Sequence, residues 1–212
     1  DPSDIQYIDG DTDRVAFGIG TNGSRSTVIG GSALWQAAGK IIEKGKRIAA
    51  HFMEADVEDM DYADGLFTVA GTDRSMSLVD VARSAFMHAK LPPDLEGGLF
   101  ETATFSPEAD TFPNGAHVCE LEIDPETGQV NLVCCWVVDD VGTVINPMGL
   151  KGQIHGGIAQ GLGQALMEQV VYDPDSGQIL SGSFMDYTMP RADKNCAIQV
   201  ESNPVPTKQN PL

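Results

Sequence analysis

Glycine, asparagine and small hydroxyl residues are concentrated in one stretch, GIGTNGSRSTVIGGSAL, at residues 18–34. Glycine lets a backbone approach a ligand closely, while the hydroxyls and the guanidinium of Arg25 supply hydrogen-bond donors. The apolar run that follows predicts the start of a helix, where unpartnered N–H groups and the helix dipole favour an anion. The stretch therefore predicts a phosphate or pyrophosphate site, with a helix-capping turn as the alternative. It matches neither the dinucleotide fingerprint nor the P-loop.

A second glycine-rich stretch, GLKGQIHGGIAQGLGQAL at residues 149–166, carries six glycines. Each costs up to about 1 kcal/mol against alanine inside a helix, so either another backbone or a ligand must approach closely. Gln153, Gly157, Gln160 and Gln164 are spaced four, three and four apart and share one helix face. Amides and bare backbone suit a flat, polar heterocycle. The alternative is tight helix packing with the glutamines in solvent.

The other residues that could act as catalysts or ligands form no catalytic or metal-binding pattern. Asp9, Asp11 and Asp13 are spaced like the start of a calcium loop, but Arg14 stands where that loop needs glycine. The four histidines have no zinc-like spacing, and no nucleophile motif is present. We expect the four cysteines to be reduced packing residues, with the neighbours Cys134 and Cys135 on opposite faces of a strand. The sequence thus predicts no metal ligand and no catalytic residue in this chain.

These stretches need helices and strands to position them. Apolar periodicity predicts helices over residues 26–54 and 146–169, and a short one over 77–89 with Ser77 as N-cap. Asn146 and Pro147 suit the start of the second long helix. A short strand that runs into a polar loop is expected over 5–13, and a turn with a short strand over 64–71. Further strands are expected at 100–106, 116–124, 129–140 and 196–202, with hairpin turns at 124–129 and 173–178. The pattern predicts an α+β fold of mixed β-sheets with hairpins and two long helices, in two parts, 1–95 and 96–212.

Composition limits the partners. The formal net charge is −18, which opposes binding to nucleic acid and to anionic membranes. An anionic ligand would have to be held by local backbone N–H groups. No apolar run approaches the ~20 residues that cross a bilayer. The chain opens on Asp1 without an initiator methionine and stops at Leu212 in a loop-like segment, so we expect a fragment of a longer polypeptide.

Both glycine-rich stretches resemble the cofactor-binding segments of the molybdenum hydroxylases. This family includes xanthine dehydrogenase, aldehyde oxidase and the large subunit of aerobic carbon monoxide dehydrogenase. The segments VVDDVGTVINP at residues 137–147 and NPVPTKQNPL at residues 203–212 fit the family too, and the order and spacing match over essentially the whole chain. The resemblance implies a molybdenum cofactor-binding domain from the C-terminal region of the large subunit.

The resemblance also implies which residues contact the cofactor. The family binds molybdopterin with molybdenum, in bacteria usually as the cytosine dinucleotide. Its Ser/Arg/Ser loop contacts the molybdenum end and the pterin-dinucleotide phosphates, and the leading Gln of its glycine helix contacts the pterin. Carried over by motif, the contacts are Asn22, Gly23, Ser24, Arg25, Ser26, Thr27, Gln153, Gly156 and Gly157.

The family's reaction hydroxylates a carbon centre with oxygen derived from water. A glutamate base activates a metal-bound hydroxyl, hydride moves to a molybdenum-bound sulfur, and electrons leave through 2Fe-2S clusters to FAD on partner subunits or domains. The base belongs to a G-x-G-E type motif that this chain lacks, and neither Glu168 nor Glu201 stands in such a motif. We therefore expect the chain alone to be inactive and to bind the cofactor weakly or not at all.

The resemblance implies an oxidoreductase acting on an aldehyde, an N-heterocycle or a purine, or oxidising carbon monoxide. Its large subunit would join FAD-binding and iron–sulfur subunits in a dimer of heterotrimers. Cysteine usage favours the cytoplasm, with the periplasm still open. Two alternatives remain: a non-catalytic cofactor-binding or scaffold module that lacks the catalytic glutamate, and an unrelated phosphate-binding α+β domain.

Overall fold

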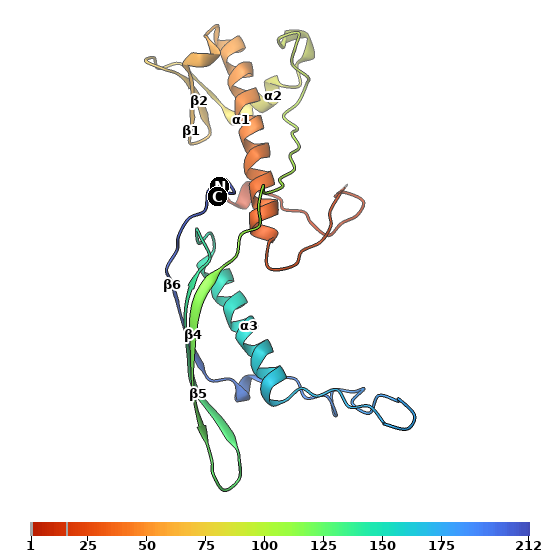
Figure 1. Cartoon of the computed structure of the whole chain (residues 1–212). Coiled ribbons are helices and arrows are strands. Elements are labelled where there is room, and N and C mark those ends of the chain that lie inside the picture. The colour runs from red at the N-terminus through yellow and green to blue at the C-terminus, as the bar shows by residue number, and fades with distance from the viewer. Residues whose placement is uncertain (1, 16) are drawn as a thin grey trace. The chain divides into compact units, whose positions relative to one another are not determined.

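The computed structural model of the protein describes residues 2–15 and 17–212, apart from the side chain of Lys194. It comprises two compact units, one reaching to Pro107 and the other spanning Glu108–Asn210. Each unit contains one long helix and one three-stranded sheet (Figure 1). The sheet of the first unit is antiparallel and that of the second is mixed. This architecture confirms the expected α+β class.

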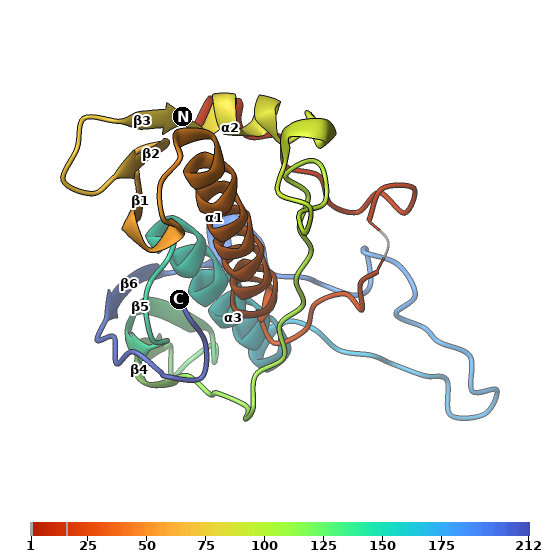
Figure 2. The same ribbon diagram turned by 90° about the horizontal axis from the view of Figure 1, so that it is seen from above.

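The first unit is built around the long helix α1, Ser32–Met53, which a π-helical turn at Thr27–Gly31 precedes. The strands of its sheet follow in the order β1-β2-β3, and Figure 2 shows them beside α1. Their bounds are Met60–Ala63 for β1, Leu66–Val69 for β2 and Ser75–Ser77 for β3. Helix α2, Leu78–Ser84, begins as expected at Ser77, whose hydroxyl accepts the N–H of Asp80.

The core of the first unit lies between α1, its sheet and α2. Ile48 and Phe67 are fully buried in it, together with Val81 of α2. Gly45 on α1 faces the ring of Phe67 closely, since a Cβ there would lie 2.5 Å from Cζ. Packing against this core fixes α1, and with it the loop at its N-terminus.

The second unit contains a long antiparallel hairpin with a parallel third strand. Strand β4, Asn114–Ile123, pairs with β5, Val130–Asp140, through the predicted turn between them. Strand β6, Ala197–Ser202, pairs with β5 in parallel. Helix α3, Pro147–Leu166, connects the two strands and runs alongside the curved hairpin in Figure 1. The second predicted turn closes as a hairpin at the bridge between Tyr172 and Ile179.

Two predicted strands are absent from the described residues. The segment 5–13 pairs with no other strand of the described chain, and Ile5 is 74% exposed. The segment 100–106 is irregular, and its groups contact other elements instead of a neighbouring strand. Lys40 donates to the Thr102 carbonyl at 2.7 Å, and the Phe100 ring lies against Phe86. Both predictions are wrong for the same reason, since a strand needs a hydrogen-bonding neighbour.

Short helices complete the structure. The single-turn 3-10 helices are Pro2–Asp4, Val57–Asp59, His88–Lys90 and Ala192–Lys194. Among the helices of residues 2–15 and 17–212, none is both long and apolar enough to cross a membrane.

Candidate functional site

The glycine-rich loop before α1 adopts an unusual backbone. Gly23 has φ +56°, and Ser24 follows with φ +57°. Residues other than glycine rarely occupy this left-handed region, because Cβ then crowds the next carbonyl at a cost of about 1–2 kcal/mol. Ser24 therefore adopts a backbone conformation that a serine disfavours, and the turn keeps it in spite of this cost. Such strained turns are typical of functional sites.

The start of the helix leaves donors open to a ligand. Ser26 stands at the N-cap with helical dihedral angles, and its side chain makes no capping hydrogen bond. Ser26 and Thr27 are exposed, and the π-helical turn begins with Thr27. Local π-turns occur frequently at functional sites. Because the hydroxyl of Ser26 does not cap the helix, the arrangement favours the anion site over the capping turn.

Arg25 is the one cation of this loop. Its side chain is half-buried, and within the described chain no carboxylate lies within ion-pair distance of its guanidinium. A guanidinium fork binds phosphate through two parallel hydrogen bonds. The net charge of the chain is −18, so an anionic ligand depends on local positive charge, which Arg25 supplies at this loop.

Two local devices position α3. Asn146 caps it, since its side-chain oxygen accepts the N–H of Gly149 at 2.9 Å. The Asp140 carboxylate, at the end of β5, accepts the N–H groups of Gly142 and Val205, each at 2.9 Å. These N–H groups hold the pKa of Asp140 below its ordinary value. Asp140 thus links the connection between β5 and α3 to the segment after β6. The sequence around Asp140 does not reveal this role.

Five of the six glycines of α3 fall into two classes, and the sixth, Gly149, lies beside the capping side chain of Asn146. Gly163 is buried, and a Cβ there would meet the Glu168 carboxylate and lie 2.5 Å from Cγ of Pro190. At four other positions a Cβ would meet nothing within 4 Å: Gly152, Gly156, Gly157 and Gly161. Tight packing therefore explains Gly163, but no part of the described chain requires glycine at the four open positions. Their bare backbone is left for a group that approaches from outside.

His155 lies in the same helix and was not singled out from the sequence. Its ring is half-buried, and its Nε2 is buried without a hydrogen-bond partner among the described residues. A buried polar atom without a partner costs roughly 1–3 kcal/mol. The neighbouring open glycines and this orphaned nitrogen fit a polar group that the chain itself does not supply. A single histidine within a helix has no sequence pattern that would identify it as a site residue.

The predicted site residues form two separate sets. Residues 22–27 are consecutive in the loop and first turn of the first unit. Gln153 and Gly157 lie one helical turn apart on α3, with Gly156 beside them, and all three are exposed. The structure therefore brings each set together within its own unit.

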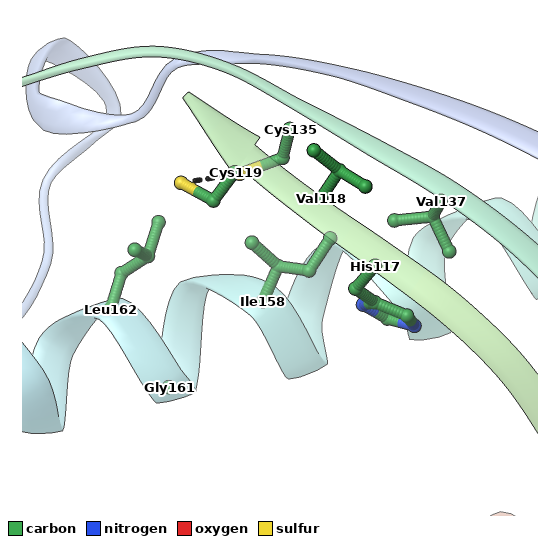
Figure 3. A pocket seen from close by; sticks show the side chains of 8 residues that line it. All are labelled: His117, Val118, Cys119, Cys135, Val137, Ile158, Gly161 and Leu162. Atoms are coloured by element: carbon green, nitrogen blue, oxygen red, sulfur yellow. Dashed lines mark hydrogen bonds between the residues drawn. The ribbon is translucent and has the colours of Figure 1, made fainter. Parts of the chain in front are cut away.

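The cavities of the second unit lie elsewhere. One, of about 200 Å³, lies between α3 and the β4–β5 hairpin and is mostly apolar. Figure 3 shows Ile158 and Leu162 of α3 facing Cys119 and Cys135 across it. A second, also about 200 Å³, lies at the start of α3 beside β6. Neither is lined by a predicted cofactor contact, so those contacts belong to exposed surface.

Comparison with known proteins gives the family. A family model described as a molybdopterin cofactor-binding domain matches residues 1–195. The chain belongs to this family. The molybdopterin cofactor-binding domain also agrees with the resemblance to the molybdenum hydroxylases, which the relatives confirm.

Two relatives are subunits of dehydrogenases. The carbon monoxide dehydrogenase large chain of Hydrogenophaga pseudoflava is 36% identical over 209 residues, which are 98% of this chain and 26% of the relative. The gamma subunit of the 6-hydroxypseudooxynicotine dehydrogenase complex of Paenarthrobacter nicotinovorans is 37% identical, over 90% of this chain and 24% of the relative. The chain thus spans about a quarter of the length of these relatives.

Solved structures agree in fold. A crystal structure of Cu,Mo-CO dehydrogenase in its carbon monoxide reduced state matches with a TM-score of 0.84 and 34% identity, covering 94% of this chain and 25% of that one. Quinoline 2-oxidoreductase from Pseudomonas putida 86 matches with a TM-score of 0.82 and 38% identity, covering 92% and 25%. The α+β arrangement of the molybdopterin-binding domain is therefore shared with these two oxidoreductases.

Proposed function

We propose that this domain binds molybdopterin, in its cytosine dinucleotide form with molybdenum, within the large subunit of a molybdenum hydroxylase. The observation that carries the proposal is the set of open glycines on α3, which nothing in the described chain explains. The family match supplies the identity of the group that approaches them. The subunit would hydroxylate an aldehyde, an N-heterocycle or a purine, or oxidise carbon monoxide.

The residues divide the binding task by chemistry. Residues 22–27 offer hydroxyls, helix N–H groups and the Arg25 guanidinium, which suit the phosphates of the dinucleotide. Gln153 offers an amide, and Gly156 and Gly157 offer bare helix backbone, which suit the flat pterin. Backbone and amide donors bind an anionic cofactor without requiring a basic surface, in agreement with the net charge of −18. When bound, the molybdenum cofactor supplies the redox and oxygen-transfer chemistry of the hydroxylation.

This chain would bind and orient the cofactor but would not supply the general base. Glu168, one of the two carboxylates considered above, is already engaged, because its Oε2 accepts the Tyr187 hydroxyl at 2.6 Å. That hydrogen bond raises the pKa of Tyr187. Glu168 also packs beside Gly163, which gives it a structural role at the end of α3. We expect the base to come from another part of the large subunit.

We propose that the remainder of the large subunit covers the apolar surface of the second unit. Val118 and Ile123 on β4 are about 60% exposed, and β4 is exposed along its whole length. Relatives four times as long contain the chain that would cover it. FAD-binding and iron–sulfur subunits would complete the enzyme as a dimer of heterotrimers. The four cysteines are unbridged, which is typical of the cytoplasm and supports that location.

The test is metal and nucleotide analysis of the full-length subunit purified with its partners. We expect a molybdenum and a cytidine monophosphate, released by acid, for every chain. In Arg25→Ala and Gln153→Ala both contents should fall together. Losing a charge-assisted hydrogen bond costs about 1.5–3 kcal/mol, which corresponds to roughly tenfold or more in affinity.

Matched controls use the same changes away from the site. Arg83 is exposed on α2 and pairs only with Asp80 in the described chain, at 3.3 Å, so Arg83→Ala removes the same charge. Gln178 lies exposed in the second hairpin turn, so Gln178→Ala removes the same amide. Both controls should load fully. Absence of molybdenum and nucleotide from the unmodified subunit would instead indicate the scaffold module, and full loading of both site variants would refute the site residues.

A further inference from the structure

Three of the four cysteines bring their sulfurs together in the sheet of the second unit. Cys119 on β4 and Cys135 on β5 are directly opposite each other in the antiparallel register, and Cys196 comes immediately before β6. Sγ of Cys135 lies 3.5 Å from Sγ of Cys119 and 3.5 Å from Sγ of Cys196. Figure 3 shows the contact between Cys119 and Cys135. The sequence spacing gave no sign of this cluster, because long-range strand pairing creates it.

The cross-strand pair has the geometry that a disulfide needs. Directly opposite residues of antiparallel strands have Cα atoms about 4.5–5.5 Å apart, within the range of about 4.4–6.8 Å for disulfides. Side-chain rotation can bring the two sulfurs from 3.5 Å to bonding distance without moving the strands. Cys135 has a comparable sulfur contact on its other side, so two bonds compete for one sulfur.

A small oxidant can reach the cluster. Cys119 is exposed in this domain, and both Cys119 and Cys135 line the apolar cavity of about 200 Å³ that α3 closes with Ile158 and Leu162. Where the rest of the subunit covers β4, a molecule has to be small enough to enter this cavity to reach the two sulfurs. This volume exceeds the roughly 30 Å³ that a water molecule occupies. Apolar walls admit a small neutral molecule and disfavour a charged one. Hydrogen peroxide has this size and charge, whereas glutathione disulfide is large and ionic.

The hydrogen bonds assign an order to the three thiols. The Cys196 thiol donates to Cys135, and the Cys135 thiol donates to Cys119. Burial, and then its hydrogen bonds to the other thiols, raise the pKa of Cys135 to about 12, so this thiol keeps its proton at neutral pH. Cys119 accepts a hydrogen bond at the exposed end of the row. Because Cys119 is also exposed and lines the cavity, it is the thiol that meets the oxidant first.

We propose that Cys119, Cys135 and Cys196 form a peroxide-oxidisable thiol site in which Cys135 bonds to one neighbour at a time. In the first step the Cys119 sulfur attacks hydrogen peroxide: an S–O bond forms, the O–O bond breaks, and the released hydroxide takes the Cys119 proton and leaves as water. In the second step the Cys135 sulfur attacks that of Cys119: the S–S bond forms, the S–O bond breaks, and the Cys135 proton leaves with the hydroxyl as water. Two thiols are oxidised and the peroxide is reduced to two waters.

Cys196 gives the oxidised site a second form. Its sulfur can attack Cys135 in the first disulfide: the Cys135–Cys196 bond forms, the Cys119–Cys135 bond breaks, and the Cys196 proton passes to Cys119, which returns to the thiol state. One bond then links β4 to β5, and the other links β5 to the start of β6. Both bonds hold the sheet beside α3, the helix that carries the exposed glycines Gly156 and Gly157.

The experiment uses the full-length subunit, reduced, exposed to hydrogen peroxide or to glutathione disulfide, and then alkylated. Cleavage after glutamate separates Cys119 from Cys135, because Glu120 and Glu126 lie between them. Mass spectrometry should find Cys119 linked to Cys135, or Cys135 to Cys196, after peroxide treatment. Alkylation should be lost at the two linked residues together and should return with dithiothreitol. Glutathione disulfide should cause far less loss.

Variants identify the sulfurs. Cys135→Ser and Cys119→Ser should each abolish both linkages, whereas Cys196→Ser should leave only that between Cys119 and Cys135. Cys134→Ser is the matched control, since Cys134 is equally buried on the same strand but its thiol donates to the Cys135 carbonyl. It should leave both linkages intact. The proposal is overturned if peroxide yields no linkage in the unmodified subunit, a measurement that needs no variant to fold, or if it links Cys134 instead.

Discussion

Replacing single glycines of α3 by alanine separates the binding of a cofactor from the packing of the helix. At Gly156 or Gly157 an added Cβ meets nothing within 4 Å. Alanine in an exposed helix interior is more stable than glycine by about 0.5–1 kcal/mol. For a chain of this size, that gain raises the melting temperature by about 1–4 °C. We therefore expect Gly156→Ala and Gly157→Ala to make the 212-residue chain more stable.

At Gly163 the same substitution has the opposite sign. Its Cβ would lie 2.5 Å from Cγ and 2.8 Å from Cδ of Pro190, whose ring cannot rotate away. Overpacking of this kind costs about 1–3 kcal/mol, which exceeds the gain in helix propensity. Gly163→Ala should thus lower the melting temperature. One helix then carries stabilising and destabilising alanines at positions that the local sequence does not distinguish.

We expect the molybdenum content of these variants to rank in a different order from their thermal stability. In the full-length subunit, Gly156→Ala and Gly157→Ala should contain less molybdenum, because a methyl group occupies the surface that the pterin approaches. Gly39→Ala on α1 is the control, since its Cβ also meets nothing within 4 Å, and it should gain stability and load fully. A more stable protein that loads poorly cannot be explained by misfolding. Full molybdenum content in both α3 variants would refute the inference from the open glycines.

Two further predictions concern the elements that hold the sites in place. Gly45→Ala should destabilise the first unit by about 1–3 kcal/mol in urea unfolding, because its Cβ would lie 2.5 Å from the buried Phe67 ring; unchanged stability would show that the ring can yield. The pKa of Asp140 is lowered by the N–H groups of Gly142 and Val205, so its contribution to stability is present above its unfolded pKa and is lost as pH falls through the folded pKa. Asp140→Asn should accordingly weaken the chain at neutral pH and flatten the acid limb of its stability-against-pH curve, whereas a parallel curve would contradict this role.

Local chemistry in the sequence predicted the parts of the fold that depend on neighbouring residues. Ser77 before an apolar helix pattern, and Asn146 followed by Pro147, predicted two helix starts that the structure confirms. Both signals work because a cap satisfies N–H groups two or three residues away. The two hairpin turns were predicted for a similar reason, since each turn is stabilised by its own side chains.

Features that depend on distant partners were not predictable in this way. Strand β3 has three residues and exists because β2 pairs with it, while the segment 5–13 finds no such partner among the described residues. Cys134 and Cys135 were expected to be packing residues and are buried, but the contact of Cys135 with Cys119 and Cys196 comes from pairing across the sheet. The cofactor contacts are a prediction from motif resemblance. The orphaned nitrogen of His155 could be found only from burial.

The parallel pairing of β5 with β6 sets the order in which the second unit is assembled during synthesis. The β4–β5 hairpin can close as soon as Asp140 has left the ribosome, because its contacts are local. One edge of β5 then remains unpaired until β6 is synthesised, and β6 follows α3 and the second hairpin in the chain. Until Ser202 emerges, that edge presents unpaired N–H and C=O groups, which is the kind of surface on which nascent chains aggregate. The helix that carries the open glycines is thus synthesised before the sheet beside it is complete.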